Sequence, residues 1–313
     1  MLPTGDSHAQ PLPAPAVRQL DDLPSDILYK LLAGLPAGDV VRMSVLSQAW
    51  ISRWESVPDL EIVILARRRR SRARRPPSVP SEIDLDDRVR DWESAAGFLE
   101  RCAARVRGVS IRGIPLRLFD RADGWVRTVA GKSPRSLSLA LNMTALPSLF
   151  ACNPGALADL KLVTCVLPPP PPAFAGFRVL TALDLDYVLF SGEKGWERLE
   201  AMISSAAPTL EKLRLANIGF EHGAAGGAIP GAWIIQASNL RWLELRLTMA
   251  GAGSWELGHQ PKLDYANITL NAHEPRHYGS MLAALASVRE LEIGNFGCAT
   301  YQEMKTFHQM KIS

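Results

Sequence analysis

Cysteine and histidine are the residue types in this sequence that most readily bind a metal ion or act as nucleophiles. The four cysteines, Cys102, Cys152, Cys165 and Cys298, are far apart in the sequence, so the chain has no C-x-x-C pair. The six histidines show no metal-ligand spacing either. Because zinc sites use closely spaced Cys and His residues, we expect no metal and no cofactor. The dispersed cysteines are typical of reduced thiols in a cytosolic or nuclear protein.

The other patterns associated with catalysis are also incomplete. The glycine-rich segment "GAAGGAIPG", residues 223 to 231, lacks the Lys-Ser/Thr pair of a phosphate-binding loop. No serine or cysteine stands in a recognisable nucleophile motif. We therefore expect no catalytic residue, and we expect a protein that is not an enzyme.

The basic residues are concentrated in one segment, "RRRRSRARR". Its seven arginines are Arg67, Arg68, Arg69, Arg70, Arg72, Arg74 and Arg75. The chain has a net charge of +3, and without these seven it would have 28 basic against 32 acidic residues, a net charge of −4. Three interpretations stay open: a solvated linker, which is favoured, a nuclear-import signal, and a nucleic-acid contact. The last is disfavoured because no aromatic residue is interleaved with the arginines.

The composition predicts a folded intracellular protein. Hydrophobic residues make up 47% of the chain and charged residues 21%, as in soluble globular proteins. The segment before Leu20 contains no apolar stretch of signal-peptide length. The longest uncharged run, from Ser136 to Ala158, contains two prolines and would make a poor membrane helix. We expect a nuclear and/or cytoplasmic location and no membrane contact.

A short L-x-L unit recurs through the chain after residue 85, often with another apolar residue three positions earlier. Its first residue is Leu137, Leu160, Leu183, Leu213, Leu243, Ile268 or Leu291, with Val109 as a weaker earlier member. The steps between the seven are 23, 23, 30, 30, 25 and 23 residues, close to the roughly 20–29 residues of leucine-rich repeats. L-x-L also recurs by chance in any leucine-rich protein, but the regular steps favour a repeat array of short strands.

The segments around these units supply further expectations. "LADLKLVTC" fits the repeat pattern most fully, with Leu157, Leu160, Leu162 and Cys165 at its four apolar places, and Asn142 is expected at the same place as Cys165. Two helices are predicted, one with Leu199, Met202, Ile203 and Ala206 on one face, and one with Trp92, Ala95, Leu99, Cys102 and Val106 on one face. The five prolines at 168 to 172 suit a stiff loop between repeats, with a polyproline ligand as the alternative.

Residues between the inward leucines are expected to face outward, because side chains alternate along a strand. These outward residues could line a surface for a target protein, or they could simply be the solvated face of each strand. The candidates are Lys161, Asp184, Asp186, Arg214, Glu244 and Arg246.

Residues 23 to 54, "LPSDILYKLLAGLPAGDVVRMSVLSQAWISRW", predict three short helices. Pro24 suits the first turn of a helix, and Gly34 and Pro36 suit its end. This segment is too small to bury a complete core, yet its apolar residues exceed what one helical face covers. It therefore packs on the rest of the chain or on a partner. Composition alone leaves both open and favours the first.

This segment resembles an F-box, specifically that of plant F-box proteins with leucine-rich repeats. The matching residues are Leu23, Pro24, Ile27, Leu28, Leu31, Leu35, Pro36, Val40 to Arg42, Val45 to Ser47, Trp50 and Trp54. Gln48 and Ala49 depart from the family, which usually has a basic residue before the first tryptophan. The resemblance continues into "GWVRTVAGKSPRSLSLAL" and the later repeats.

The resemblance implies an α/β fold, a small N-terminal three-helix F-box followed by an irregular leucine-rich-repeat solenoid. We expect a disordered tail over residues 1–19, the F-box over 20–62, an Arg/Pro-rich linker over 63–84 and the repeat domain over 85–313.

The resemblance also implies a function: the substrate-recognition subunit of a Skp–cullin–F-box ubiquitin ligase. The F-box would bind the Skp adaptor, and through it the cullin, while the repeats would hold an unknown protein substrate. The adaptor-binding residues implied in this way are Leu23, Pro24, Ile27, Leu28, Leu31, Leu35, Val41, Val45, Leu46, Trp50 and Trp54. The alternative is a repeat scaffold for protein interaction, unrelated to ubiquitin, in which the N-terminal helices cap the array.

Overall fold

A computed structural model describes Pro24, Ile27, Glu93, Ala96, Gly97 and the ranges 60–65, 99–101, 106–221, 232–246, 254–271 and 278–296. It has the expected α/β class. The strands of the main sheet are β1 (Leu60–Leu65), β2 (Val106–Arg112), β3 (Ser136–Ala145), β4 (Asp159–Leu167), β5 (Ala182–Asp186), β6 (Leu189–Phe190), β7 (Lys212–Ala216), β8 (Gly219–Phe220), β10 (Trp242–Arg246), β12 (Tyr265–Asn271) and β13 (Glu290–Phe296). The strands β9 (Ala232–Ile235) and β11 (Ser254–Leu257) form a separate pair.

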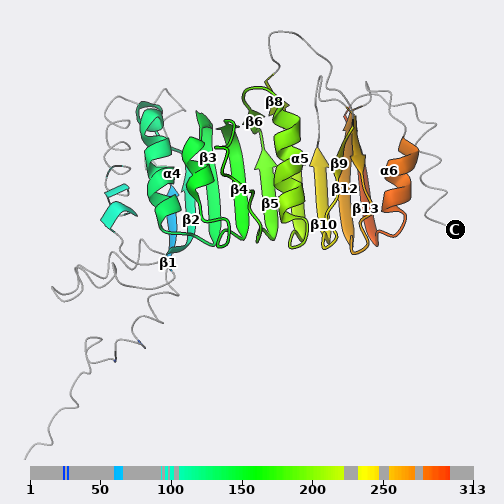
Figure 1. Cartoon of the computed structure of the whole chain (residues 1–313), viewed down its shortest axis with the longest axis horizontal. Coiled ribbons are helices and arrows are strands. Elements are labelled where there is room, and N and C mark those ends of the chain that lie inside the picture. Colours follow the sequence, from blue (N-terminus) through cyan, green and yellow to red (C-terminus); the bar gives the residue numbers. More distant parts are fainter. Residues whose placement is uncertain are drawn as a thin grey trace, which may run out of the picture.

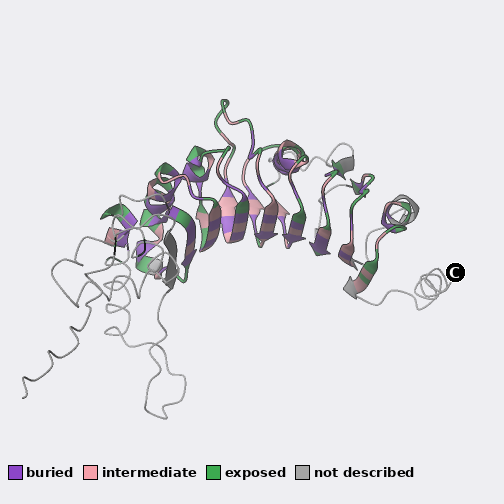
Figure 2. Ribbon diagram, turned by 90° about the horizontal axis from the view of Figure 1, so that it is seen from below, coloured by how far each residue is buried: buried purple, intermediate pink, exposed green. Residues whose placement is uncertain are grey.

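Strand order follows chain order, β1-β2-β3-β4-β5-β7-β10-β12-β13, and every pair along this path is parallel. Helices that lie between strands are η4 (Leu116–Arg121), α4 (Ala122–Gly131), η5 (Pro147–Ala151), α5 (Gly195–Ala206) and α6 (Tyr278–Leu285), of which η4 and η5 are 3₁₀ helices. The sheet curves, and its strands run along the inner side of an arc while α4, α5 and α6 lie on the outer side (Figures 1 and 2). No helix within the described residues combines the length and apolarity needed to cross a membrane.

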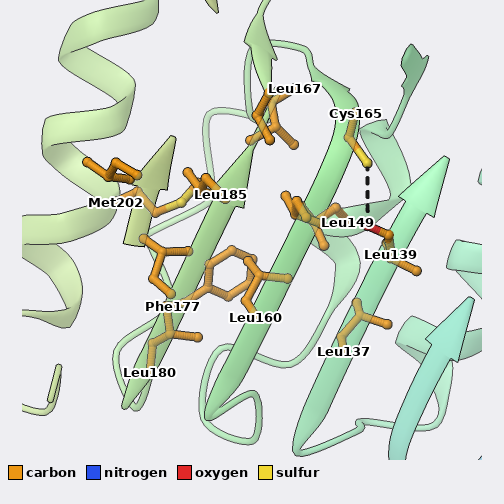
Figure 3. Close-up of a cluster of buried hydrophobic side chains, with 14 of the residues drawn as sticks. Leu137, Leu139, Leu149, Leu160, Cys165, Leu167, Phe177, Leu180, Leu185 and Met202 are labelled. Atoms are coloured by element: carbon orange, nitrogen blue, oxygen red, sulfur yellow. Dashed lines mark hydrogen bonds between the residues drawn. The ribbon is translucent and has the colours of Figure 1, made fainter. Parts of the chain in front are cut away.

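The L-x-L units form the strands and face the core. Leu137, Leu160, Leu183, Leu213 and Leu243 are neighbours in register across five strands. Each is at most 1% exposed, as is the second leucine of each unit. The apolar residues three positions earlier form a further buried row: Val106, Leu157, Leu180, Leu210, Leu240 and Leu263. Burial of these rows supplies most of the hydrophobic stabilisation of the array, and Figure 3 shows part of it.

A residue with left-handed backbone conformation follows the L-x-L part of several strands. Positive φ angles occur at Gly113 (72°), Asn142 (47°), Thr164 (50°), Tyr187 (52°) and Asn217 (51°). Four of these stand four residues after the first apolar residue of their unit, and Asn142 stands five after it. Because only glycine adopts this conformation without steric cost, Gly113 suits its place, and the other four turns are held by their neighbours. In β2, β5 and β7 the residue with positive φ directly follows the strand, whereas β3 and β4 continue beyond it to Ala145 and Leu167.

Three expectations about single residues are wrong, and the first concerns Ile268. The unit after Leu243 begins at Ala266, which is opposite Leu243 and 0% exposed, whereas Ile268 is opposite Leu245. Ile268 is therefore the second inward residue of its unit rather than the first. The leucine pattern missed this unit because its first buried residue is an alanine.

The place of Asn142 is also different from the prediction. The register shifts between Ala140 and Thr144 in β3, so Thr144, not Asn142, is opposite Cys165. Asn142 is exposed, and its backbone N–H donates to the Thr164 hydroxyl at 3.2 Å. A β-bulge adds residues to one strand only, and nothing in the local sequence marks it.

The helix predicted to end at Val106 stops earlier. Leu99 is helical and buried as expected, and Ala96, which was not assigned to that face, is helical and buried as well. Val106 instead begins strand β2 and belongs to the buried row. Trp92, Ala95 and Cys102 of the predicted face lie outside the described residues. The helix of Leu199, Met202, Ile203 and Ala206 is confirmed as α5, with all four buried. The five prolines lie between β4 and β5, as expected for a loop. Strand β1 includes residues 63 to 65, which the sequence assigned to the linker.

Two cysteines in the core lead to a chemical prediction. Cys152 is 1% and Cys165 0% exposed. Burial raises the pKa of Cys152 to about 11. Burial also raises the pKa of Cys165 to about 12, although hydrogen bonds to backbone carbonyls, such as that of Val163 at 3.2 Å, partly offset it. Since the thiolate is the nucleophile, we expect iodoacetamide at pH 8 to leave both residues unmodified in the folded protein and to label them in urea. Peptide mass spectrometry checks this, and rapid labelling without urea would contradict the buried placement.

Candidate functional site: the polar inner face of the sheet

The inner face of the sheet is polar, and no described helix covers its middle (Figure 2), which is unusual for parallel strands. Parallel sheets normally have both faces covered. Here the leucines of each unit point to the helix side, and the residue between them points to the other side. The row formed by these intervening residues is Ser138, Lys161, Asp184, Arg214, Glu244, Asn267 and Glu292, each opposite the next across the strands.

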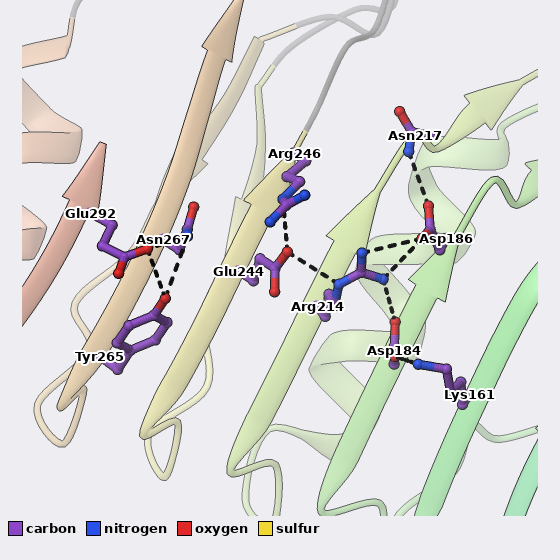
Figure 4. Close-up of polar contacts among 10 residues, drawn as sticks. All are labelled: Lys161, Asp184, Asp186, Arg214, Asn217, Glu244, Arg246, Tyr265, Asn267 and Glu292. Atoms are coloured by element: carbon purple, nitrogen blue, oxygen red, sulfur yellow. Dashed lines mark hydrogen bonds and ion pairs between the residues drawn. The ribbon is translucent and has the colours of Figure 1, made fainter. Parts of the chain in front are cut away.

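Charged residues on this face form one continuous network (Figure 4). The Arg214 guanidinium is at its centre and contacts Asp184 at 2.9 Å, Asp186 at 3.1 Å and Glu244 at 3.2 Å. Arg246 extends the network at one end, with its Nε 2.8 Å from Glu244. Lys161 extends it at the other end by an ion pair with Asp184. The strand register creates the network, because it places alternating charges on adjacent strands.

The electrostatics of the network are balanced. Three basic and three acidic side chains give it a net charge of zero. Burial by itself would lower the pKa of Arg214, but the hydrogen bonds and charges of Asp184, Asp186 and Glu244 outweigh it and raise that pKa. The guanidinium therefore stays charged at all ordinary pH values. The network gives the middle of the face a charged surface whose opposite charges balance.

All six residues predicted for a target surface lie in this network: Lys161, Asp184, Asp186, Arg214, Glu244 and Arg246. The structure brings them together on one face, but it pairs them with each other. Their side chains are between 11% and 45% exposed, with Lys161 and Arg246 the most accessible. Their role in binding a target stays a prediction.

An aromatic pair on the same face was missed by the sequence interpretation. The rings of Trp242 and Tyr265 stack with centroids 5.5 Å apart and an angle of 10°. Each residue immediately precedes a buried residue of its unit, so its side chain lies on the inner face of the sheet. The two residues are opposite each other on the neighbouring strands β10 and β12. The Tyr265 hydroxyl donates to Glu292 at 3.1 Å, and Asn267 donates to the same carboxylate. For Trp242 the available signal was its position just before an L-x-L unit, whereas Tyr265 precedes Ala266, which the leucine pattern missed.

Two further pKa shifts occur on this face. The hydrogen bond from Asn267 would lower the pKa of the Tyr265 phenol, but loss of hydration and the charges of Glu292 and Glu244 together raise it. Partial loss of hydration and the neighbouring Asp184 raise the pKa of Asp159. Neither group sits in a cluster suited to proton transfer. In the described part of the chain, no set of three or more His, Cys, Asp or Glu side chains is arranged to hold a metal ion.

The predicted adaptor-binding segment is described at two of its residues. Pro24 is exposed, and Ile27 is helical with 45% of its surface exposed. The Ile27 N–H donates to the Pro24 carbonyl at 3.1 Å, as expected for a helix that begins near Pro24. The other predicted adaptor residues lie outside the described residues: Leu23, Leu28, Leu31, Leu35, Val41, Val45, Leu46, Trp50 and Trp54. The seven arginines from Arg67 to Arg75 also lie outside them.

Comparison with known proteins identifies the N-terminal segment. The F-box domain family matches residues 20–61. An F-box/FBD/LRR-repeat protein of Arabidopsis thaliana is 28% identical over 211 residues, which cover 63% of this chain and 40% of the relative. An FBD-associated F-box protein of the same plant is 25% identical with the same two coverages. F-box/LRR-repeat protein 13, also from Arabidopsis thaliana, is 24% identical over 67% of this chain and 43% of its own length. The aligned part of this chain thus spans less than half the length of each of these relatives.

Proposed function

We propose that this F-box protein of plant type, with its leucine-rich-repeat-like region, is a substrate-recognition subunit of a Skp–cullin–F-box ubiquitin ligase. One observation carries the proposal. The F-box match ends at residue 61, and the parallel array begins at Leu60. An F-box segment and a curved sheet with a polar inner face are thereby joined directly in one chain.

In this proposal the F-box is a three-helix module that docks on the Skp adaptor, which connects it to the cullin. The array is an irregular leucine-rich-repeat solenoid that holds the target protein. F-box proteins are generally non-catalytic, and this chain would act in the same way. It would raise the effective concentration of target lysines near a ubiquitin-charged enzyme. No reaction step needs a residue of this chain.

We assign the target surface to the inner face, with the Trp242–Tyr265 pair as its anchor. Large aromatic side chains dominate the energetics of protein interfaces, and this pair is presented on a face that no described helix covers. The neutral charge network beside it adds hydrogen-bonding groups, and a partner that separates its ion pairs without replacing them is penalised. Specificity for the target would come from the network, and affinity from the aromatic pair.

Substitution of both aromatic residues tests this surface. We expect Trp242→Ala with Tyr265→Ala to reduce adaptor-dependent co-purification of target proteins about tenfold or more, because two anchors are removed. Binding of the adaptor itself should not change. Trp242→Phe with Tyr265→Phe keeps two stacked rings and is the matched control, so it should retain most of the target. Quantitative mass spectrometry of the purified complexes measures both. Equal target recovery by the alanine and phenylalanine variants would contradict the assignment.

A second function, a repeat scaffold capped by the N-terminal helices, has one observation in its favour. Strand β1 overlaps the end of the F-box match at Leu60 and Glu61 and pairs with β2. The F-box segment therefore connects to the edge of the sheet without an intervening linker. A cap would contribute to the stability of the array, whereas an adaptor-binding module would not be needed for it.

The expected nuclear and/or cytoplasmic location is part of the proposal. Arg67 to Arg75 would act as an import signal if the protein enters the nucleus. Microscopy of a fluorescent fusion, with and without these seven arginines, checks the location. An unchanged distribution would assign the tract to the linker instead.

A further inference from the structure

A pocket on the outer side of the array is lined almost entirely by apolar side chains. It lies between the proline-rich loop after β4 and helix α5, and its volume is about 290 Å³. Its lining residues are Phe150, Leu167, Pro168, Pro170, Phe174, Ala175, Gly176, Phe190, Arg198, Ala201 and Met202. Leu167 and Met202 are labelled in Figure 3. This volume is at the small end of the range for ligand sites.

Arg198 is the charged residue of this pocket, and its guanidinium has no acidic partner among the described residues. Nη1 donates to the Leu167 carbonyl at 3.4 Å, and Nη2 donates to the Ser191 carbonyl. The guanidinium also lies 5.8 Å from the centroid of the Phe190 ring. Its Nε is buried and has no hydrogen-bond acceptor within the same part of the chain. Burial lowers the pKa of Arg198 for the same reason, the loss of hydration.

A buried cationic donor without an acceptor is costly to the folded state. An anion with two oxygen atoms relieves this cost best, because guanidinium and carboxylate pair in a bidentate geometry. Only two of the five guanidinium N–H groups have acceptors among the described residues, so the guanidinium of this pocket-lining residue keeps donor capacity for an anion. The site therefore combines one anion-binding group with an apolar cavity.

The walls of the pocket are held by their own packing. Phe174 contacts Phe150 and Phe177 edge to face, with both centroid distances 4.9 Å. Gly176 has φ of +85°, and an added Cβ there would lie 2.2 Å from the Ser205 hydroxyl, so the loop approaches α5 too closely for any larger residue. The prolines at 168 to 172 restrict the backbone of the loop just before Phe174. A ligand would then enter a cavity that is largely formed already.

We propose that this pocket binds a small carboxylic acid with an apolar tail of medium length, its carboxylate on Arg198 and its tail against the phenylalanine and proline side chains. The site is on the outer side of the array, away from the inner face assigned to the target. The proposal is therefore independent of the proposed function.

Octanoate and octan-1-ol form a matched pair of probes, since they differ in charge and share the same tail. We expect octanoate to bind the full chain saturably at sub-millimolar to low millimolar concentration, and octan-1-ol to bind about tenfold more weakly. Isothermal titration calorimetry, with ligand-observed NMR for the weaker probe, measures both. Equal affinity for the two probes, or no saturable octanoate binding up to about 10 mM, would overturn the proposal.

Two substitutions locate the binding. Arg198→Met keeps the length of the side chain and removes the charge, so it should weaken octanoate about tenfold and leave octan-1-ol nearly unchanged. Ala201→Trp fills the rim of the pocket at an exposed position and should abolish binding of both probes. If Arg198→Met fails to fold, Arg198→Lys is tested instead. Lysine keeps the charge but cannot form the bidentate pair, so we expect a loss of octanoate affinity smaller than that expected for Arg198→Met. Unchanged octanoate affinity in Ala201→Trp would place the binding elsewhere and overturn the assignment.

Discussion

Replacement of Leu23 and Pro24 by alanine is expected to abolish binding of the Skp adaptor. Loss of interface anchors costs about 2 kcal/mol or more, which corresponds to a loss of affinity of about 30-fold or more. Pro24 and Ile27 are exposed in the structure. The substitution also removes the proline that starts the helix, so the local backbone loses a preferred first turn. Surface plasmon resonance with the purified adaptor and the full chain measures the change.

The chain supplies its own control for this experiment. Leu12 and Pro13 form the same dipeptide outside the F-box match, and their replacement by alanine should leave adaptor affinity unchanged. The melting temperature of the two variants separates the two proposed functions. An adaptor-binding module predicts the same melting temperature for the array in both, whereas a structural cap predicts a lower one for Leu23→Ala with Pro24→Ala. Intact, folded protein that shows no affinity for the adaptor would exclude the ligase function.

Replacement of Arg214 by methionine is expected to cause the largest loss of stability on the polar face. Methionine keeps the aliphatic stem but leaves Asp184, Asp186 and Glu244 without their shared cation. The Arg214 side chain is 22% exposed, so its charged hydrogen bonds are weakened by solvent only in part. We expect a loss of about 2 kcal/mol in the free energy of unfolding, or a melting temperature lower by roughly 4–8 °C for a domain of this size. Urea and thermal unfolding measure it.

Arg241→Met is the matched control for this effect. Arg241 also points to a carboxylate, Asp264, but at 3.6 Å and with 60% of its side chain exposed, so its loss should cost less than about 1 kcal/mol. The double variant Arg214→Met with Asp186→Asn restores the balance of charges and should lose less stability than Arg214→Met. If Arg214→Met is no more harmful than Arg241→Met, the network contributes no more than separate surface ion pairs.

The sequence by itself determined the repeating architecture of the array. The spacing of Leu160, Leu183 and Leu213 places each at the same height on successive strands, because a strand buries every second residue and burial rewards the register that aligns them. The same logic predicted which residues face outward. It also placed the F-box segment, where proline and apolar residues recur in a fixed order that the family comparison recognises.

Several details depended on contacts between residues that are far apart in the chain. Ala266 stands in a place that leucine occupies in the neighbouring units, and only its pairing with Leu243 reveals this; the bulge that displaces Asn142 depends on pairing between β3 and β4. The short-range sequence pattern contains neither pairing. The predictions failed at these points for that reason.

On the polar inner face, too, the sequence predicted some features and tertiary contacts decided the others. Alternation along each strand predicted that Lys161, Asp184 and Arg214 point away from the core. Only the parallel register decides that they meet on the inner face and neutralise one another. The stacking of Trp242 on Tyr265 of the next strand, and the unpaired Nε of Arg198 above an apolar pocket, likewise arise from tertiary contacts. One-dimensional periodicity determines the face on which a side chain lies. Three-dimensional packing determines its neighbours, and these neighbours decide whether its charge is satisfied or available to a ligand.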